Sequence, residues 1–389
     1  MTIEALLISP ALRGGEGVYS RTLTEHPPPG VNYSVTDSSH EDAPGARCNR
    51  AAEVLLNRGV RPVAFPDAAF RVMRLKQRFD LIHVHAHPVL LRGRGAAPLV
   101  MSEGSSSAVY LREYLGWERD RVRSRYRRAR RIYRTLGIDD RLLAQEHAAR
   151  VFVFSRWARS VNLRWGADPE KLEVLYPGFP TPPKIERDGT EQFRFLFVGT
   201  DFERKGGFEV VEAFAEVVRA APQARLTVIA PDPALRNPDR RFHSWVGSAR
   251  RSAALATLAQ LIRAGLADFS ALMSRERLYA EQYPRANAFV MPTHAEGLGF
   301  TNIEAMGFGL PVISSAVGPI PEVVADGVTG RLVPAGDVRA LTDAMLGLAG
   351  DRTRAQELGD AGRSAFLARF TLERFRIGLG DLYQRALSS

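Results

Sequence analysis

Residues 292–318 read PTHAEGLGFTNIEAMGFGLPVISSAVG, and this stretch decides how the rest of the chain is interpreted. The apolar run Phe289 to Met291 precedes it, and Asn302 to Met306 has helical character. The residues between them are therefore predicted to form a strand-to-helix loop. Such a loop offers free backbone N–H groups and the positive end of a helix dipole to a phosphate or a polyol.

Two glutamates lie eight positions apart here, Glu296 on the loop and Glu304 in the helix that follows. On the loop, the Glu296 carboxylate can accept hydrogen bonds from sugar hydroxyls. Glu304 is predicted about two turns into the helix, where it could meet a ribose diol. A glutamate pair at this spacing is usually the solvated edge of a helix, but the surrounding glycines favour a binding site.

The stretch resembles the retaining glycosyltransferases of family 4, the glycosyl transferases of group 1, which have the GT-B fold. Their E-x7-E motif and the E-A-M-x-x-G-x-P-V-I that follows are matched by Glu296, Glu304 to Met306, Gly309 and Pro311 to Ile313. The resemblance implies an α/β fold with two doubly wound, Rossmann-like domains facing a central cleft. The donor-binding candidates that follow from it are Met273, Gly297, Gly299, Phe300, Thr301 and Glu304.

A second cluster, FVGTDFERKGG at residues 197–207, carries two cations just before a predicted helix. Gly199 permits a tight turn after the strand, and Arg204 and Lys205 beside a helix N-terminus suit a diphosphate. In the resembled family a lysine at this place neutralises the leaving diphosphate, together with an arginine directly after the first glycine. Thr200 occupies that arginine position here, so the role passes to Arg204. The alternative is that both cations are merely solvated.

The first half of the chain supplies weaker candidates. Gly14 and Gly15 follow the first predicted strand in a loop, and the resemblance places such a glycine pair beside the phosphates and the acceptor. The alternative is that these glycines serve only the conformation of the turn. Where the family commonly has a histidine near the anomeric carbon, this chain has Glu103, which could orient sugar hydroxyls or accept a proton. Ser102 and Ser105 are the rivals for that position.

His83, His85 and His87 alternate along one predicted strand and its end, so their side chains are expected on one face. Three imidazoles on one face could ligate zinc. Packing is the favoured interpretation, because no further ligand is spaced to complete a metal site, and we expect no metal. A third interpretation brings one of the histidines to the acceptor pocket.

The chain has 389 residues, which favours two domains. We place domain 1 at residues 1–178 on the acceptor side and domain 2 at 179–370 on the donor side, divided at the proline-rich linker from Pro177. A helix at 371–389 is expected to return to domain 1. The predicted strands are Glu4–Ser9, Asn32–Asp37, Pro62–Phe65, Leu81–His85, Pro98–Ser102, Val151–Ser155, Leu172–Tyr176, Phe193–Val198, Arg225–Ala230, Asp268–Met273, Ala286–Met291, Pro311–Ser314 and Gly330–Val333.

The composition indicates a globular enzyme of the cytoplasm, with 45% hydrophobic residues and neither a long apolar run nor a signal peptide. The single cysteine, Cys48, excludes an intrachain disulfide and is expected to fill space in or near a helix face. The net charge is +10, and residues 119–134 hold nine arginines against Asp120. Three interpretations of this segment remain open. It is a solvated helix, or it binds the inner membrane face or an anionic acceptor, or, as the least favoured interpretation, it binds nucleic acid.

Together these features predict a retaining, metal-independent transfer of a hexose from a UDP- or GDP-sugar to the hydroxyl of a glycan, lipid or small molecule. Glu296, Lys205, Arg204 and Glu103 are the catalytic candidates. No cofactor besides the nucleotide sugar is expected, and the unknown acceptor includes lipid-linked or anionic molecules. The alternatives are a sugar-nucleotide epimerase of the same fold and a non-enzymatic basic scaffold or nucleic-acid-binding protein.

Overall fold

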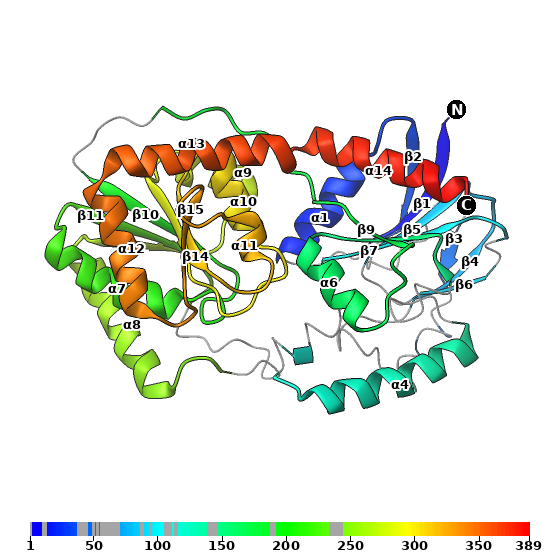
Figure 1. Ribbon diagram of the computed structural model, residues 1–389, viewed down its shortest axis with the longest axis horizontal. Helices are drawn as coiled ribbons and strands as arrows, with labels where there is room; N and C mark the ends of the chain where they lie inside the picture. The colour runs from blue at the N-terminus through cyan, green and yellow to red at the C-terminus, as the bar shows by residue number, and fades with distance from the viewer. Residues whose placement is uncertain are drawn as a thin grey trace. The chain divides into compact units, whose positions relative to one another are not determined.

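The computed structural model describes residues 2–9, 14–36, 46–48, 51, 54, 71–85, 89–92, 95–104, 111–112, 116–137, 147–186, 192–232 and 244–389. The chain divides into two compact units (Figure 1). Unit 1 is Met1–Phe179 together with Leu372–Ser389, and unit 2 is Pro180–Thr371. The division after Phe179 falls next to the one expected from the proline-rich linker.

Unit 1 is built on a six-stranded parallel sheet in the order β2-β1-β5-β7-β8-β9. Its strands are β1 (Ile3–Ile8), β2 (Val31–Thr36), β5 (Leu81–His85), β7 (Leu99–Glu103), β8 (Arg150–Val153) and β9 (Leu172–Val174). The strands β5 and β7 are buried along their whole length, as expected for a parallel sheet that is covered on both faces.

Helices cover both faces of this sheet, as Figure 1 shows. The helices α1 (Gly14–Glu25) and α14 (Leu372–Leu387) contact the face that carries His83 and His85. Tyr19 of α1 has its ring centroid 4.5 Å from that of His85. The helix α6 (Arg156–Arg164) covers the other face, where Ala158 joins the cluster of Ile82 and Val84. Because side chains alternate along β5, one set packs against α1 and α14 and the other set packs on the face covered by α6.

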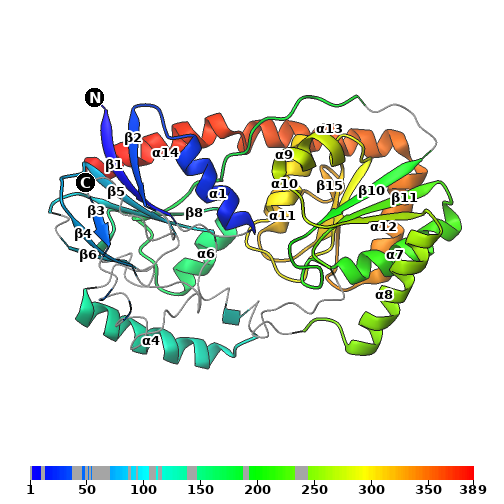
Figure 2. The same cartoon turned by 180° about the vertical axis from the view of Figure 1, so that it is seen from behind.

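A small second sheet in unit 1 was not predicted. It consists of β3 (Ala46–Cys48), β4 (Arg71–Leu75) and β6 (Val89–Arg92) in the order β3-β4-β6, visible at the left of Figure 2. Cys48 therefore lies in a strand and not in a helix. Strands of three to five residues are too short for the alternation of side chains to be distinctive. The predicted strand Pro62–Phe65 lies outside the described residues.

Unit 2 has a second six-stranded parallel sheet, in the order β12-β11-β10-β13-β14-β15. Its strands are β10 (Phe193–Val198), β11 (Ala224–Ile229), β12 (Ala267–Ser270), β13 (Ala288–Met291), β14 (Val312–Ser315) and β15 (Gly330–Val333). The predicted strand Asp268–Met273 is too long, because Ser274 already caps the next helix by accepting from the N–H of Arg277 at 3.3 Å.

The helices of unit 2 also form two layers. One layer contains α7 (Gly207–Ala220), α8 (Ser248–Arg263) and α12 (Val338–Gly350), and the other contains α10 (Phe300–Gly307) and α13 (Arg352–Arg369) (Figure 1). The shorter elements are α9 (Arg275–Arg277), a π-helix (Leu278–Gln282) and α11 (Ile320–Val323). Both units are therefore doubly wound.

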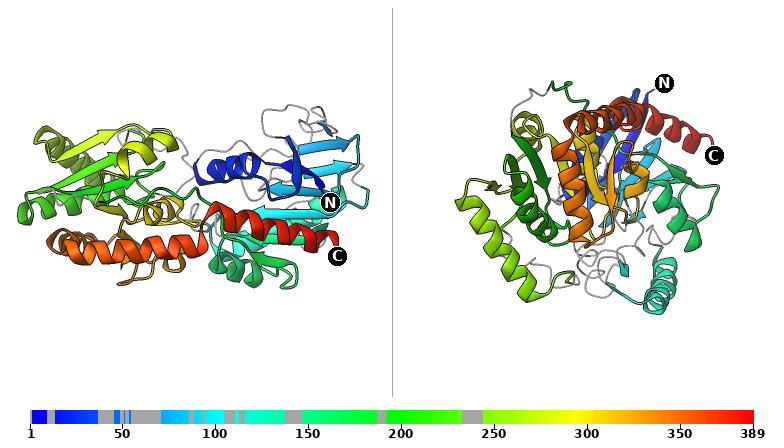
Figure 3. Two further views of the ribbon diagram at one scale, coloured as in Figure 1. Left: turned by 90° about the horizontal axis from the view of Figure 1, so that it is seen from above. Right: turned by 60° about the vertical axis from the view of Figure 1, so that its left-hand side comes forward.

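The last helix, α14, belongs to unit 1 although it follows unit 2 in the chain (Figure 3). Its first N–H, from Leu372, donates to the carbonyl of Phe179 at 2.9 Å. The arginine-rich segment forms α4 (Arg119–Leu136), also in unit 1. None of the helices that the structure describes has the length and apolar character needed to cross a membrane.

Candidate functional site

The order of strands in unit 2 reverses between β10 and β13, which are neighbours at the centre of the sheet. In open parallel sheets, ligands bind at the carboxyl ends of the two strands that flank such a switch point. The loop after β10 carries Arg204 and Lys205, and the loop after β13 carries Glu296. The topology thus brings both predicted motifs to one edge of one sheet.

Backbone contacts fasten these two loops together. The N–H of His294 and the hydroxyl of Thr293 both donate to the carbonyl oxygen of Arg204, at 2.8 and 3.1 Å. Gly206 precedes α7 with a φ of 79°, and a Cβ there would collide with the carbonyl of Pro292. Glycine is therefore required at this position for both its backbone conformation and the close approach.

The side chains at this edge form a buried charge cluster. The Lys205 ammonium is hydrogen-bonded to Oε2 of Glu296, and Nη1 of Arg204 lies 3.8 Å from the same oxygen. Arg204 also donates to the carbonyl of Ala295 at 2.7 Å and forms an ion pair with Asp201 at 3.3 Å. All of the ionised side chains in this cluster are only 11–12% exposed.

Burial and mutual charge shape the protonation of this cluster. Burial lowers the pKa of Lys205, and the neighbouring Arg204 lowers it further against the opposing effect of Glu296. Burial alone would raise the pKa of Glu296, but Lys205 and Arg204 together hold that pKa below its usual value. At neutral pH, Glu296 is accordingly a carboxylate paired with two cations.

The helix α10 starts directly beside Glu296. Gly299 is its N-cap with a φ of 85°, and the helix runs from Phe300. The N–H groups in the first turn of a helix have no partner inside the helix, and they form the positive end of its dipole. The N–H of Gly297 donates to Oε1 of Glu296 at 3.0 Å, and the hydroxyl of Thr301 contacts the sulfur of Met291 at 3.2 Å.

Glu304 lies in a separate buried cluster of polar side chains in unit 2. Because α10 begins at Phe300, Glu304 is little more than one turn from its start, and the expected two turns are wrong. Its carboxylate accepts from the hydroxyl of Tyr283 at 3.1 Å and pairs with Nε of Arg275 at 3.0 Å. Burial raises the pKa of Glu304, with Arg275 opposing. Met273 precedes this arginine on the connection after β12.

Residues 192–351 match the family model described as glycosyl transferases group 1. The alpha-maltose-1-phosphate synthase of Mycolicibacterium smegmatis is 29% identical over 354 residues, 86% of this chain and 83% of that protein. A D-inositol 3-phosphate glycosyltransferase of Segniliparus rotundus is 29% identical over 57% of this chain and 49% of its own length. The solved sucrose-phosphate synthase of Thermosynechococcus elongatus is 19% identical with a TM-score of 0.68, covering 99% of both chains.

The chain is thus similar to the group 1 glycosyltransferases, by the family model over residues 192–351 and by one relative over most of its length. Its two Rossmann-like units are those of the GT-B fold, and glycosyl transfer is its reaction class. The chain spans about half the length of the inositol phosphate relative that it matches, 49%.

Sequence reasoning missed one residue that braces the cationic loop of this glycosyltransferase. Glu203 precedes Arg204, and its Oε1 accepts from the hydroxyl of Ser244 at 2.7 Å and from the N–H groups of Trp245 and Val246 at 2.8 and 3.0 Å. Its other oxygen pairs with Arg251 at 2.5 Å. One carboxylate thus fastens residues 244–246 and α8 to the loop that carries the candidate cations.

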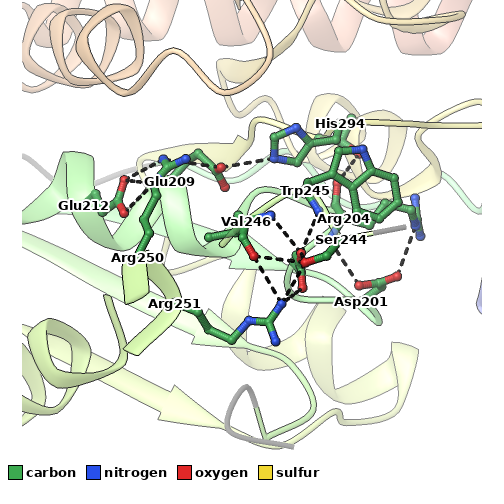
Figure 4. Close-up of polar contacts among 12 residues, drawn as sticks. Asp201, Arg204, Glu209, Glu212, Ser244, Trp245, Val246, Arg250, Arg251 and His294 are labelled. Carbon is green, nitrogen blue, oxygen red and sulfur yellow. Dashed lines mark hydrogen bonds and ion pairs between the residues drawn. The ribbon is translucent and has the colours of Figure 1, made fainter. Parts of the chain in front are cut away.

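A second brace reaches the loop of Glu296. The indole of Trp245 stacks on His294, with ring centroids 5.8 Å apart and an angle of 18° between the planes. Nε2 of His294 lies 3.1 Å from Oε1 of Glu209, which is 1% exposed on the first turn of α7. Arg250 of α8 lies 3.5 Å from that glutamate (Figure 4). The sequence carries no local signal for these pairs, because their members come from different elements.

The switch point of unit 1 lies between β1 and β5. Gly14 and Gly15 were expected in a loop, but they open the helix α1. The first turn of a helix has N–H groups without partners inside the helix, so these glycines need no separate loop to offer such donors. Glu103 is the last residue of β7 and is 4% exposed. Ser105 and His87 lie outside the described residues.

His83 and His85 belong to a buried hydrogen-bond network of unit 1. The Ser102 hydroxyl lies 2.8 Å from Nε2 of His83 and 2.9 Å from Nδ1 of His85. Nδ1 of His83 lies 2.7 Å from the hydroxyl of Tyr383, which is 2.6 Å from that of Tyr33. Within the described residues, no group of three or more metal-ligating side chains comes together. Buried hydrogen bonds of Ser102 and the two histidines thus join β5 to β7 and α14.

Proposed function

We propose that this glycosyltransferase is a retaining enzyme of family 4 that moves a hexose from a nucleoside diphosphate sugar to an acceptor hydroxyl. The observation that carries the proposal is the meeting of Lys205, Arg204 and Glu296 at the switch point of unit 2. Unit 2 would bind the donor and unit 1 the acceptor. UDP- and GDP-sugars are the proposed donors.

Departure of the diphosphate places negative charge on its oxygens as the anomeric carbon gains oxocarbenium character. Lys205 and Arg204, with the first-turn N–H groups from Gly299 to Thr301, would stabilise that charge in a water-poor site. Because the Lys205 ammonium has three donors, it can serve a phosphate oxygen while still bonded to Glu296.

The glutamates would hold the sugar nucleotide on either side of the diphosphate. Glu296, anchored through the N–H of Gly297, would accept from sugar hydroxyls, and Glu304 from the ribose. The departing diphosphate oxygen would take the acceptor proton on the same face, which gives retention of configuration. Glu103 would orient sugar hydroxyls or, in place of the diphosphate oxygen, accept the acceptor's proton.

Lys205 and Arg204 would supply the positive charge that a metal ion supplies in other reactions with a phosphate or diphosphate leaving group. We therefore propose that transfer needs no metal. Turnover in excess EDTA should equal turnover without it. A loss of activity that zinc or manganese restores would refute this part of the proposal.

Thermal-shift titration with UDP-, GDP- and ADP-sugars tests donor binding directly. One nucleotide should raise the melting temperature of the wild type, and Lys205→Ala should abolish the shift. Lys184→Ala removes an exposed lysine of the same unit and is the matched control. Proton NMR of the product formed with a sugar acceptor then reads the anomeric configuration. An inverted product, or no nucleotide binding, would defeat the proposal.

A sugar-nucleotide epimerase of the same fold is the second candidate, and the shared chemistry of diphosphate binding is what favours it. It predicts that the enzyme alone converts one nucleotide sugar into its epimer. Incubating each donor without acceptor, followed by anion-exchange chromatography, separates the two. Transfer that requires an acceptor excludes epimerisation as the main activity.

A further inference from the structure

The arginine-rich helix α4 is fixed to unit 1 by one narrow side. Val122 and Ala129, two turns apart, are fully buried or nearly so. Tyr126, on the same side, has its ring 5.3 Å from that of Trp165. The guanidinium of Arg121 lies 4.1 Å above the ring of Trp117, which precedes the helix. These contacts hold the helix in one orientation about its own axis.

The opposite side of α4 presents arginines to solvent. Figures 1 and 2 show the helix along the border of unit 1, away from both sheets of that unit. At 100° per residue, the exposed arginines span an arc of about 200° that excludes the side of Val122 and Ala129. They are Arg119, Arg121, Arg123, Arg127, Arg128, Arg130, Arg131 and Arg134.

This arrangement opposes the stability of the helix. Arg123, Arg127 and Arg131 follow one another at intervals of four, where like charges repel. Asp120, the single acidic residue of α4, lies 3.8 Å from Arg123. By contrast, Arg277 of unit 2 is also exposed but pairs with Glu281, four positions later, at 3.1 Å. An anionic surface would relieve the repulsion along α4.

The chemistry of the exposed side selects among anionic partners. Among the α4 residues whose side chains are described, no large apolar residue is exposed. Tyr126 and Trp117, the described rings of this region, are engaged with Trp165 and with Arg121, so they offer no platform for stacking unpaired bases. What remains is a broad, convex row of guanidinium groups, each able to bind a phosphate with two donors.

We propose that α4 docks unit 1 on a bilayer surface that carries anionic phospholipids. The arginines would contact lipid phosphates at the level of the headgroups, and no part of α4 would enter the hydrocarbon region. The attachment would therefore be peripheral and weakened by salt. This inference does not depend on the donor chemistry, and its test uses no nucleotide.

Co-sedimentation of the full chain with vesicles is the direct test. The wild type should pellet with vesicles of phosphatidylcholine mixed with phosphatidylglycerol, but not with phosphatidylcholine alone, and raised salt should release it. Replacing Arg123, Arg127, Arg128 and Arg131 by glutamine should lower the partition coefficient at least about tenfold. The matched control replaces four exposed arginines of unit 2, Arg219, Arg263, Arg285 and Arg339, and should bind like the wild type.

A second measurement covers the case in which the four-arginine variant fails to fold. Hydrogen exchange of the wild type should slow in peptides covering Arg119–Leu136 when anionic vesicles are added. Equal binding of wild type and α4 variant, or unchanged exchange in this helix, would overturn the proposal. So would tighter, α4-dependent binding of an RNA duplex than of anionic vesicles at the same ionic strength, which would assign the helix to nucleic acid.

Discussion

The hydroxyl of Tyr383 lies 2.7 Å from Nδ1 of His83, a residue 300 positions earlier in the chain. Tyr383 is on the last helix and His83 on the central strand β5. Both side chains are completely buried. Because the same hydroxyl also bonds Tyr33 of β2, one side chain of α14 is joined to two strands of unit 1. This contact is one physical reason why the C-terminal helix returns to the first unit.

Replacing Tyr383 by phenylalanine should therefore destabilise unit 1. The change leaves a buried nitrogen of His83 and the hydroxyl of Tyr33 without this partner, which costs about 1–3 kcal/mol. Urea denaturation followed by tryptophan fluorescence reports chiefly on unit 1, because Trp117, Trp157 and Trp165 lie there. Ser388→Ala, which removes an exposed hydroxyl just beyond α14, should stay within about 0.5 kcal/mol of the wild type. An unchanged midpoint for the tyrosine variant would contradict the role of the network.

Stability should fall as the pH falls below about 6.5, in part through His83. Burial is the main cause that lowers the pKa of His83 well below its usual value, and the neighbouring His85 lowers this pKa further. The unfolded chain then binds a proton that the folded chain excludes, so the free energy of unfolding decreases by up to about 1.4 kcal/mol per pH unit. His83→Gln keeps polar atoms but does not titrate, and should flatten the slope between pH 6.5 and 5. Identical slopes of the urea midpoint for both proteins would rule the contribution out.

Lys205→Ala and Glu296→Gln should each lower kcat/KM by at least about tenfold, or about 1.4 kcal/mol. Both changes also break a buried ion pair, so a loss of activity could reflect a loss of stability. The double variant Lys205→Met, Glu296→Leu separates the two, because an apolar pair of similar volume restores stability without charge. We expect its urea midpoint to recover towards the wild type while transfer stays low. Recovery of transfer in the double variant would remove both residues from the mechanism.

Glu203→Ala should weaken donor binding about three- to tenfold, although Glu203 is not proposed to touch the donor. Its carboxylate holds Trp245 and Val246 and pairs with Arg251, so its loss frees the loop that carries Arg204 and Lys205. Isothermal titration with the preferred nucleotide measures the effect, and Glu203→Gln should restore part of it by keeping an acceptor oxygen. The matched control is Glu216→Ala on α7, an exposed glutamate that pairs with Arg219. An equal loss of donor affinity in the control would show that breaking any ion pair of unit 2 has this effect, and would contradict a specific role for Glu203.

Local patterns in the sequence were sufficient for the main elements. Buried parallel strands are continuous apolar runs, and β5, β10 and β15 were predicted with the bounds that the structure shows. The cationic loop and the loop of Glu296 were recognised because glycines mark the turn between a strand and a helix. This signal is local, so it can be read from the neighbouring residues alone. Even so, Gly14 and Gly15 were misplaced in a loop, since a helix start and a glycine turn look alike in sequence.

What the amino-acid sequence determined by itself was therefore the succession of strands in the two six-stranded sheets and the residues carried by the two loops of unit 2. The tertiary structure alone decided which of those residues meet. The pairing of Lys205 with Glu296 spans 91 positions, and that of His83 with Tyr383 spans 300. Such contacts depend on the strand order around each switch point and on which face of a helix is buried. The periodicity of a single segment predicts neither the strand order nor these contacts. The hydrogen bonds and ion pairs form between side chains that are brought within reach only when the sheets and helices pack.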